Sequence, residues 1–79
     1  GQAVTLTGTL AQKVDSAHYV VKTYDGRSVF CPMLFGMNPV PVLEGDSVRV
    51  TGISAGLIVS ETVFGATTEL PCVLAFVIK

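Results

Sequence analysis

The feature that most restricts the fold of this chain is a period-two alternation of apolar and polar residues, repeated in short segments between glycine, aspartate and proline residues. In residues 3–14, Val4, Leu6 and Leu10 lie on one side of the alternation and threonines on the other. Residues 47–53 repeat this pattern. Alternation over about four to eight residues is typical of a strand with one buried face. No segment requires a long helix, so the sequence predicts an all-β protein.

The first half of the chain predicts a meander of three strands. Gly8 in the middle of the first strand predicts a bend or a bulge, because glycine weakens a straight strand. Residues 15–17 supply the first turn, and the Asp25 and Gly26 pair is a hairpin signal. The three strands are expected at residues 3–14, 18–24 and 27–32.

The second half predicts two or three further strands. Residues 33–46 are interrupted by Gly36, Pro39 and Pro41. A proline in a helix interior costs about 3 kcal/mol, so we expect a loop with at most one helical turn. Ala55 and Gly56 predict a tight turn. Strands are expected at residues 47–53, 57–64 and 70–78, with a loop at residues 65–69.

The length and charge of the chain limit its organisation and its partners. Its 79 residues predict one domain, residues 1–79, because two cores need well over a hundred residues. The chain is 49% apolar and only 14% charged, a composition that excludes a disordered tail. Its net charge of −1 excludes a strong electrostatic field that would attract nucleic acid or anionic membranes. No apolar run approaches the roughly 20 residues of a membrane span. The sequence slightly favours a cytoplasmic location. If a leader was removed before Gly1, we expect a location outside the cytoplasm instead.

The final predicted strand, residues 70–78, is apolar on both alternation faces. Such a strand is covered on both sides. A small barrel has one interior, so the outer face of this strand must meet a loop or another subunit. We therefore expect a homo-oligomer or a protein partner, with Val73, Ala75 and Val77 as the candidate interface residues.

Four segments together resemble the OB-fold, and most closely its tRNA-anti-like group. The most specific match is residues 43–52, which fit the strand motif L-x-x-G-D-x-V-x-[VI]-x-G. The other segments are residues 4–10, 19–22 and 28–31. The chain departs from the group where residues 33–46 replace a helix that usually plugs the barrel, and in the spacing around Cys72. The resemblance implies a small OB-like antiparallel barrel of five or six strands without a long helix. The alternative is a sandwich-like arrangement of six strands in which residues 70–78 add to a partner's sheet.

OB-folds generally bind oligonucleotides or oligosaccharides on the face of the second and third strands. The resemblance therefore implies an alternative function, weak single-stranded nucleic-acid binding by stacking and charge. The candidate ligand-binding residues are His18, Lys22, Tyr24, Phe30 and Arg49. The competing interpretation is that Tyr24 flanks a hairpin, Phe30 contacts a neighbouring subunit and Lys22 is a solvated charge. The chain has only five cations, so we favour a non-catalytic module that acts by self-association or protein interaction.

The sequence gives no support for an enzyme, a metal site or a cofactor. Residues 15–18 contain the residue types of a hydrolase triad, but a triad is a spatial arrangement and no oxyanion-hole signature is nearby. His18 with two distant cysteines falls short of four zinc ligands. Cys31 and Cys72 would become neighbours in an OB barrel, where a disulfide is possible. We predict two buried free thiols instead.

Overall fold

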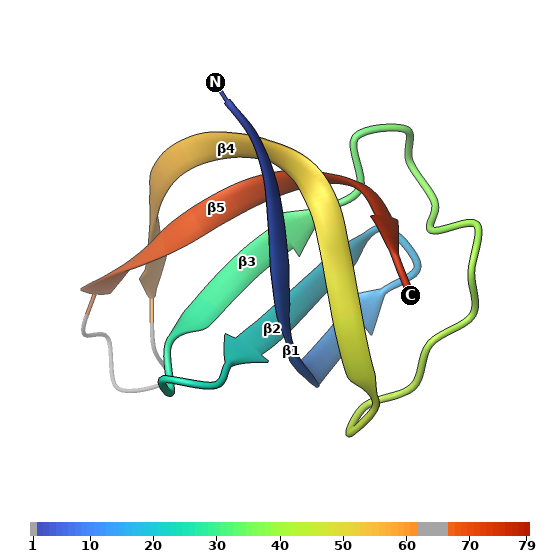
Figure 1. Ribbon diagram of the computed structural model, residues 1–79. Helices are drawn as coiled ribbons and strands as arrows, with labels where there is room; N and C mark the ends of the chain where they lie inside the picture. The colour runs from blue at the N-terminus through green and yellow to red at the C-terminus, as the bar shows by residue number, and fades with distance from the viewer. Residues whose placement is uncertain (1, 62–66) are drawn as a thin grey trace.

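Five strands form a closed barrel in the computed structural model, which describes residues 2–61 and 67–79 (Figure 1). The strands are β1 (Ala3–Asp15), β2 (His18–Thr23), β3 (Ser28–Pro32), β4 (Ser47–Glu61) and β5 (Thr67–Ile78). Their order around the barrel is β1-β2-β3-β5-β4. All neighbouring strands are antiparallel except β3 and β5, which are parallel. The prediction of an all-β barrel without a long helix is confirmed.

The β1–β2–β3 meander follows the sequence prediction closely. β1 pairs with β2 up to Asp15 and His18, and β2 pairs with β3 from His18 opposite Pro32 to Lys22 opposite Ser28. The second hairpin closes at the predicted Asp-Gly pair. There the Gly26 amide donates to the Thr23 carbonyl at 3.0 Å and the Thr23 amide donates to the Arg27 carbonyl at 2.8 Å.

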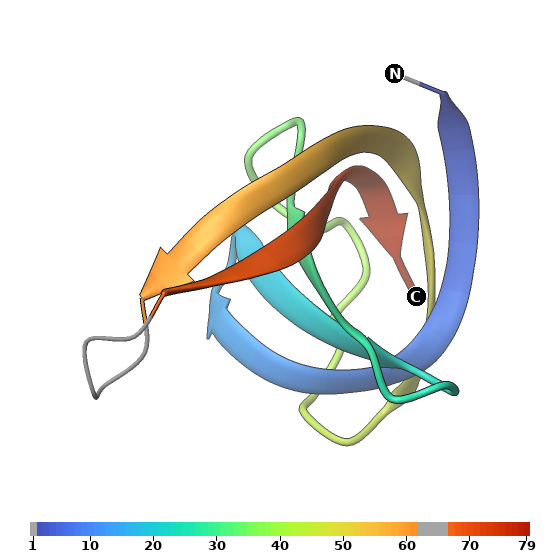
Figure 2. The same ribbon diagram turned by 90° about the vertical axis from the view of Figure 1, so that its left-hand side faces the viewer.

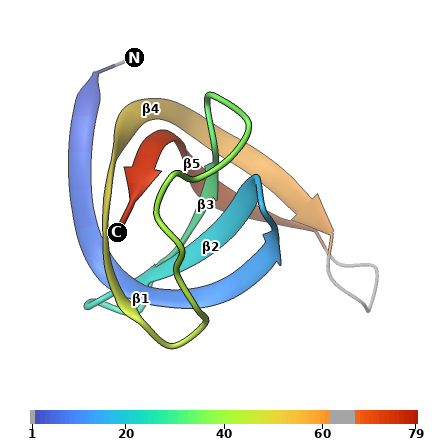
Figure 3. The same ribbon diagram turned by 90° about the vertical axis from the view of Figure 1, so that its right-hand side faces the viewer.

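β1 is shared by two neighbours and curves around the barrel (Figures 2 and 3). Its first part pairs with β4 and its second part with β2, and Gly8 belongs to both ladders, opposite Val48 and Thr23. A Cβ at Gly8 would lie 2.2 Å from the Lys22 carbonyl oxygen. The close approach of the β2 backbone thus requires glycine at this bend. The register irregularities of the β1–β2 ladder lie further along, beyond Leu10.

The prediction of a tight turn at Ala55 and Gly56 is wrong. β4 continues through these residues to Glu61, with a register shift against β5 between Ser54 and Leu57. The barrel therefore has five strands, and the segment expected as a separate strand from residue 57 is the end of β4. Residues 62–66, which include parts of that expected strand and of the loop expected after it, lie outside the described residues. β5 begins at Thr67, earlier than predicted.

All five strands contribute buried apolar side chains to the core. The strand residues of the core are Leu10, Tyr19, Val21, Val29, Cys31, Val48, Val50, Val73, Ala75 and Ile78. Met33 and Val42 of the β3–β4 connection complete it. The barrel interior is therefore occupied by a continuous cluster of apolar side chains.

The β3–β4 connection, residues 33–46, contains no helix and passes across the barrel in Figure 3. Asn38 anchors it and is buried. Its Nδ2 donates to the carbonyls of Val40 at 2.7 Å and Ile78 at 2.8 Å, and its Oδ1 accepts from the Ile78 amide at 3.1 Å. The predicted loop is confirmed, and it is held to the end of β5 by one amide side chain. Within the described part of the chain, no helix has the length and apolar character needed to cross a membrane.

Candidate functional site

The outer face of β2 and β3 carries three of the candidate ligand-binding residues. Tyr19 and Val21 point inward and are buried, so His18 and Lys22 point outward as expected. The His18 and Phe30 rings stack with centroids 6.0 Å apart and an interplanar angle of 15°. Lys22 is exposed on the same face and belongs to no ion pair among the described residues.

His18 is also held by the turn that precedes it. Its Nδ1 lies 2.8 Å from the Asp15 carboxylate, which also accepts a hydrogen bond from the Ala17 amide. The hydrogen bond to His18 and then the one to the Ala17 amide lower the pKa of Asp15. His18 therefore has one polar partner already, and its ring is fixed between the turn and Phe30.

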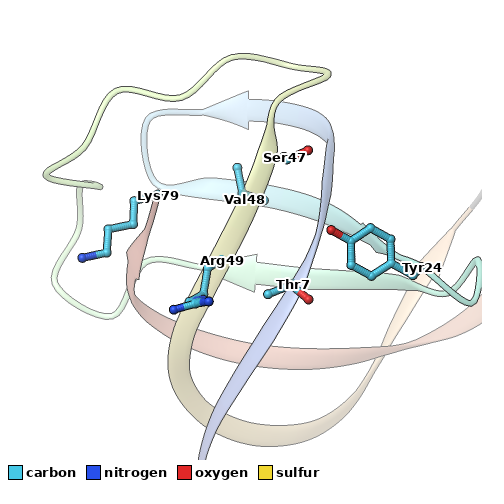
Figure 4. Close-up of a pocket in the computed structure, with 6 residues that line it drawn as sticks. All are labelled: Thr7, Tyr24, Ser47, Val48, Arg49 and Lys79. Atoms are coloured by element: carbon cyan, nitrogen blue, oxygen red, sulfur yellow. The ribbon is translucent and has the colours of Figure 1, made fainter.

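The other two candidates, Tyr24 and Arg49, do not join this face. They line an open pocket of about 360 Å³ outside β1 and β4 (Figure 4). The residues around it are Thr7, Tyr24, Ser47, Val48, Arg49 and Lys79. The five residues expected to form one surface are thus divided between two places on the barrel.

Backbone pairing explains how the pocket gathers its charged residues. Thr7 lies opposite Arg49 in the β1–β4 ladder. On the other side, the Arg49 amide donates to the Lys79 carbonyl at 2.7 Å and the Lys79 amide donates to the Arg49 carbonyl at 3.0 Å. The prediction from alternation that Arg49 faces outward is correct, since Val48 and Val50 on either side are buried. Thr7 and Lys79 were missed because the register that places them beside Arg49 is a long-range property of the barrel.

The expected orientation of Val73 and Ala75 is wrong. Their exposed fractions are 6% and 0%, so both belong to the core, whereas Val77 is half-buried. The cause is a register shift in β5: Thr51 pairs with Val77 but the next residue, Gly52, pairs with Ala75. This shift reverses the alternation, so residues 73 and 75 point inward while residue 77 does not.

The outer side of β5 is partly covered by the chain itself. The Leu34 amide donates to the Ala75 carbonyl at 2.8 Å, and the Phe35 ring stacks on Phe76 with centroids 5.9 Å apart. The covering segment is itself exposed, with Phe35 at 77% and Met37 at 66%. We call the group Leu34, Phe35, Met37 and Phe76 the Phe35 surface. The sequence signal that could have revealed the Phe35 surface is the presence of several large apolar residues in residues 33–46, a segment expected to be a loop.

The chemistry available to the buried cysteines is limited. Cys31 and Cys72 are buried free thiols, as predicted. Burial, and to a smaller extent the nearby Cys72, raises the pKa of Cys31 to about 12, and burial raises the pKa of Cys72. Both thiols are therefore protonated and poorly nucleophilic near neutral pH. The described residues contain no group of three or more His, Cys, Asp or Glu side chains placed to hold a metal ion.

Comparison of the chain with protein-family models, with curated proteins and with solved structures gives no match. The functional interpretation therefore depends on the surfaces described above.

Proposed function

We propose that this chain is a non-catalytic binding module that associates with itself or with another protein through the Phe35 surface. The observation that supports the proposal most directly is the exposure of Phe35 and Met37, at 77% and 66%, beside Leu34 at 39%. Contiguous exposed apolar groups on a small protein commonly mark interaction sites. Aromatic residues and methionine are also enriched in protein interfaces.

The low charge of the chain favours the same function. Only 14% of its residues are charged, and a domain of this size buries only about 60% of the surface of its unfolded chain. Association would remove further apolar surface from water. An apolar surface can match a second copy of itself across a two-fold axis, which makes self-association the first form to test.

An OB-like fold remains part of the proposal. A closed barrel of five strands is compatible with it. The segment that carries the most specific part of the resemblance, residues 43–52, forms the turn before β4 and the first part of that strand. The resemblance concerns architecture and does not by itself indicate a partner.

Sedimentation velocity over ~1 to ~500 µM protein tests the self-association. We expect a dimer or larger assembly, and a Phe35→Ser variant that associates about 30-fold more weakly, since loss of an aromatic anchor costs about 2 kcal/mol. Val14→Ser is the matched control, because Val14 is also an exposed apolar residue, at 53%, outside the Phe35 surface.

Apolar-dye binding makes the proposal falsifiable even for a monomer. A chain with an available Phe35 surface should bind more dye than its Phe35→Ser, Met37→Ser double variant. A wild-type chain that stays monomeric and binds no more dye than the double variant would contradict the proposal.

The second candidate function is weak single-stranded nucleic-acid binding on the β2–β3 face. One observation favours it: the stacked His18 and Phe30 rings lie on the same face as exposed Lys22. Fluorescence anisotropy with labelled oligonucleotides at ~50 mM salt should then detect binding that Phe30→Ala and Lys22→Gln both weaken. Binding that neither substitution changes would exclude this face.

A further inference from the structure

We infer that the pocket between β1, β4 and the end of β5 binds a small phosphate monoester whose phosphate is joined to a flat ring by a polar spacer, the chemistry of a nucleoside 5′-monophosphate. The site is separate from the Phe35 surface and from the β2–β3 face. It is lined by Thr7, Tyr24, Ser47, Val48, Arg49 and Lys79, and its volume is about 360 Å³ (Figure 4). That volume lies at the lower end of the range of small-molecule sites, roughly 300 to 1,000 Å³.

The backbone pairing of the barrel places two cationic residues, Arg49 and Lys79, directly opposite each other at one side of this pocket. Arg49 and Lys79 exchange both backbone hydrogen bonds, at 2.7 and 3.0 Å. Residues paired in this way have Cα atoms about 5.5 Å apart and place their side chains side by side. Like charges directly opposite each other destabilise a sheet. An anion bound between the guanidinium and the ammonium group would remove that repulsion.

No Asp or Glu side chain of the described residues forms an ion pair with Arg49 or Lys79. The ion pairs there join His18 to Asp15 and Arg27 to Asp25. Two carboxylates lie near the pocket in sequence, and both are engaged in their own turns. Asp25 accepts from the Thr23 hydroxyl, and Asp46 accepts from the Leu43 amide at 2.8 Å.

The remaining residues of the pocket fit the rest of such a ligand. Tyr24 is 80% exposed and presents an aromatic ring to which a flat ring can stack. In Figure 4, Arg49 lies between Lys79 and Thr7, while Tyr24 lies beyond Thr7. The hydroxyls of Thr7 and Ser47 can donate to or accept from a polar spacer.

The strand spacing favours a spacer over a direct link between phosphate and ring. Neighbouring strands lie about 4.8 Å apart. Tyr24 directly follows the end of β2, where Thr23 pairs with Gly8 of β1, and β1 separates β2 from Arg49 on β4. The Arg49 backbone and the Tyr24 backbone are therefore separated by roughly two strand spacings, or about 10 Å, and Lys79 lies one spacing further away. A phosphate, a sugar and a base in sequence span such a distance.

Amide NMR titrations at low salt test the site with three probes: adenosine 5′-monophosphate, ribose 5-phosphate without the base, and adenosine without the phosphate. We expect binding of the monophosphate with a Kd on the order of 1 mM. Shift changes should centre on Thr7, Tyr24, Arg49 and Lys79. Each of the two fragments should bind more weakly than the monophosphate.

Single substitutions separate the two ends of the site. Arg49→Gln and Lys79→Gln should each weaken the monophosphate and ribose 5-phosphate about fivefold, as expected for a partly screened charge contact, and leave adenosine unchanged. Tyr24→Leu should weaken the monophosphate and adenosine but not ribose 5-phosphate. Lys13→Gln removes an exposed cation outside the pocket and should change nothing.

Three results would overturn the inference. The first is no shift change at ~20 mM monophosphate. The second is an equal effect of Lys13→Gln and Arg49→Gln, which would indicate general attraction of anions to the protein. The third is equal affinity for ribose 5-phosphate and the monophosphate, which would remove the ring from the site. All substituted side chains are exposed, so the amide spectra should show a folded barrel throughout.

Discussion

At the residue scale, two glycines allow the strands to approach one another. A Cβ at Gly8 would meet the Lys22 carbonyl oxygen at 2.2 Å, and a Cβ at Gly52 would meet the Leu74 carbonyl oxygen at the same distance. The obstructing atoms belong to backbone in both places, so no side chain can move aside. The sequence indicates a special role for Gly8 because this residue interrupts an alternating strand. Gly52 gives no such signal, because it lies near the end of the strand expected at residues 47–53.

Gly8→Ala should lower the free energy of unfolding by about 3 kcal/mol, the upper part of the usual range for overpacking. Denaturation in urea measures the change. Thr5→Ala on the same strand is the control and should lie within about 0.5 kcal/mol of the wild type, because Thr5 is exposed. A Gly8→Ala variant as stable as the control would mean that β1 can shift away from β2 at low cost.

The two cysteines provide a second prediction at this scale. Burial raises the pKa of the Cys31 thiol to about 12 and that of Cys72 in the same direction. The reactive thiolate is therefore scarce at pH 8. An alkylating reagent without reductant should leave both thiols of the folded chain unmodified and add two labels after denaturation. No label after denaturation would reveal a disulfide, and rapid labelling of the folded chain would show that the thiols are accessible.

At the element scale, the bounds of strands with one unbroken apolar–polar alternation could be predicted from the sequence. The bounds of strands that contain register shifts could not. β2 and β3 came out close to the expected residues because the Asp-Gly turn fixes their pairing. Ala55 and Gly56 have the composition of a turn, but β5 pairs along β4 on both sides of them. Because β5 pairs along β4 there, these two residues form an irregularity within β4 and not a turn. β5 is distant in the sequence, so the local composition could not reveal this pairing.

The same limitation explains the outcome for the candidate sites. The outward direction of His18, Lys22 and Arg49 followed from local alternation and is correct. The grouping of Arg49 with Lys79, and the inward direction of Val73, depend on the β4–β5 register. Alternation predicts which side of a strand a residue occupies only as long as the register is unbroken.

The β3–β4 connection also yields a prediction at the element scale. Asn38 makes three hydrogen bonds to the backbone of Val40 and Ile78, and these backbone groups would lose their partner in Asn38→Ala. An unsatisfied buried polar group costs about 1 to 3 kcal/mol. We expect the free energy of unfolding to fall by about 2 kcal/mol.

Denaturant unfolding checks this loss, and Pro39→Ala is the neighbouring control because Pro39 is exposed. Asn38→Ala should also increase the exchange of the Ile78 amide with solvent. An Ile78 amide that remains as protected as in the wild type would show that the connection is held in place by other contacts.

At the scale of the whole molecule, the barrel is closed by its least extensive ladder. β3 and β5 share the register pair Phe30 and Cys72, extended by an isolated bridge between Met33 and Ala75. The β4–β5 ladder, by contrast, extends from Val50 to Glu61. The four antiparallel ladders thus form most of the sheet, and the parallel contact between β3 and β5 closes the cylinder.

Local opening of a protein usually begins where few backbone hydrogen bonds must break. We therefore expect the barrel to open between β3 and β5 before it unfolds globally. Hydrogen exchange followed by NMR should show faster exchange for the Leu34 amide, which donates to the Ala75 carbonyl at 2.8 Å, than for amides in the middle of the β1–β4 ladder. Equal protection of the β3–β5 and β1–β4 amides would instead mean that the barrel opens only by global unfolding, with the core side chains rather than the ladder holding the cylinder closed.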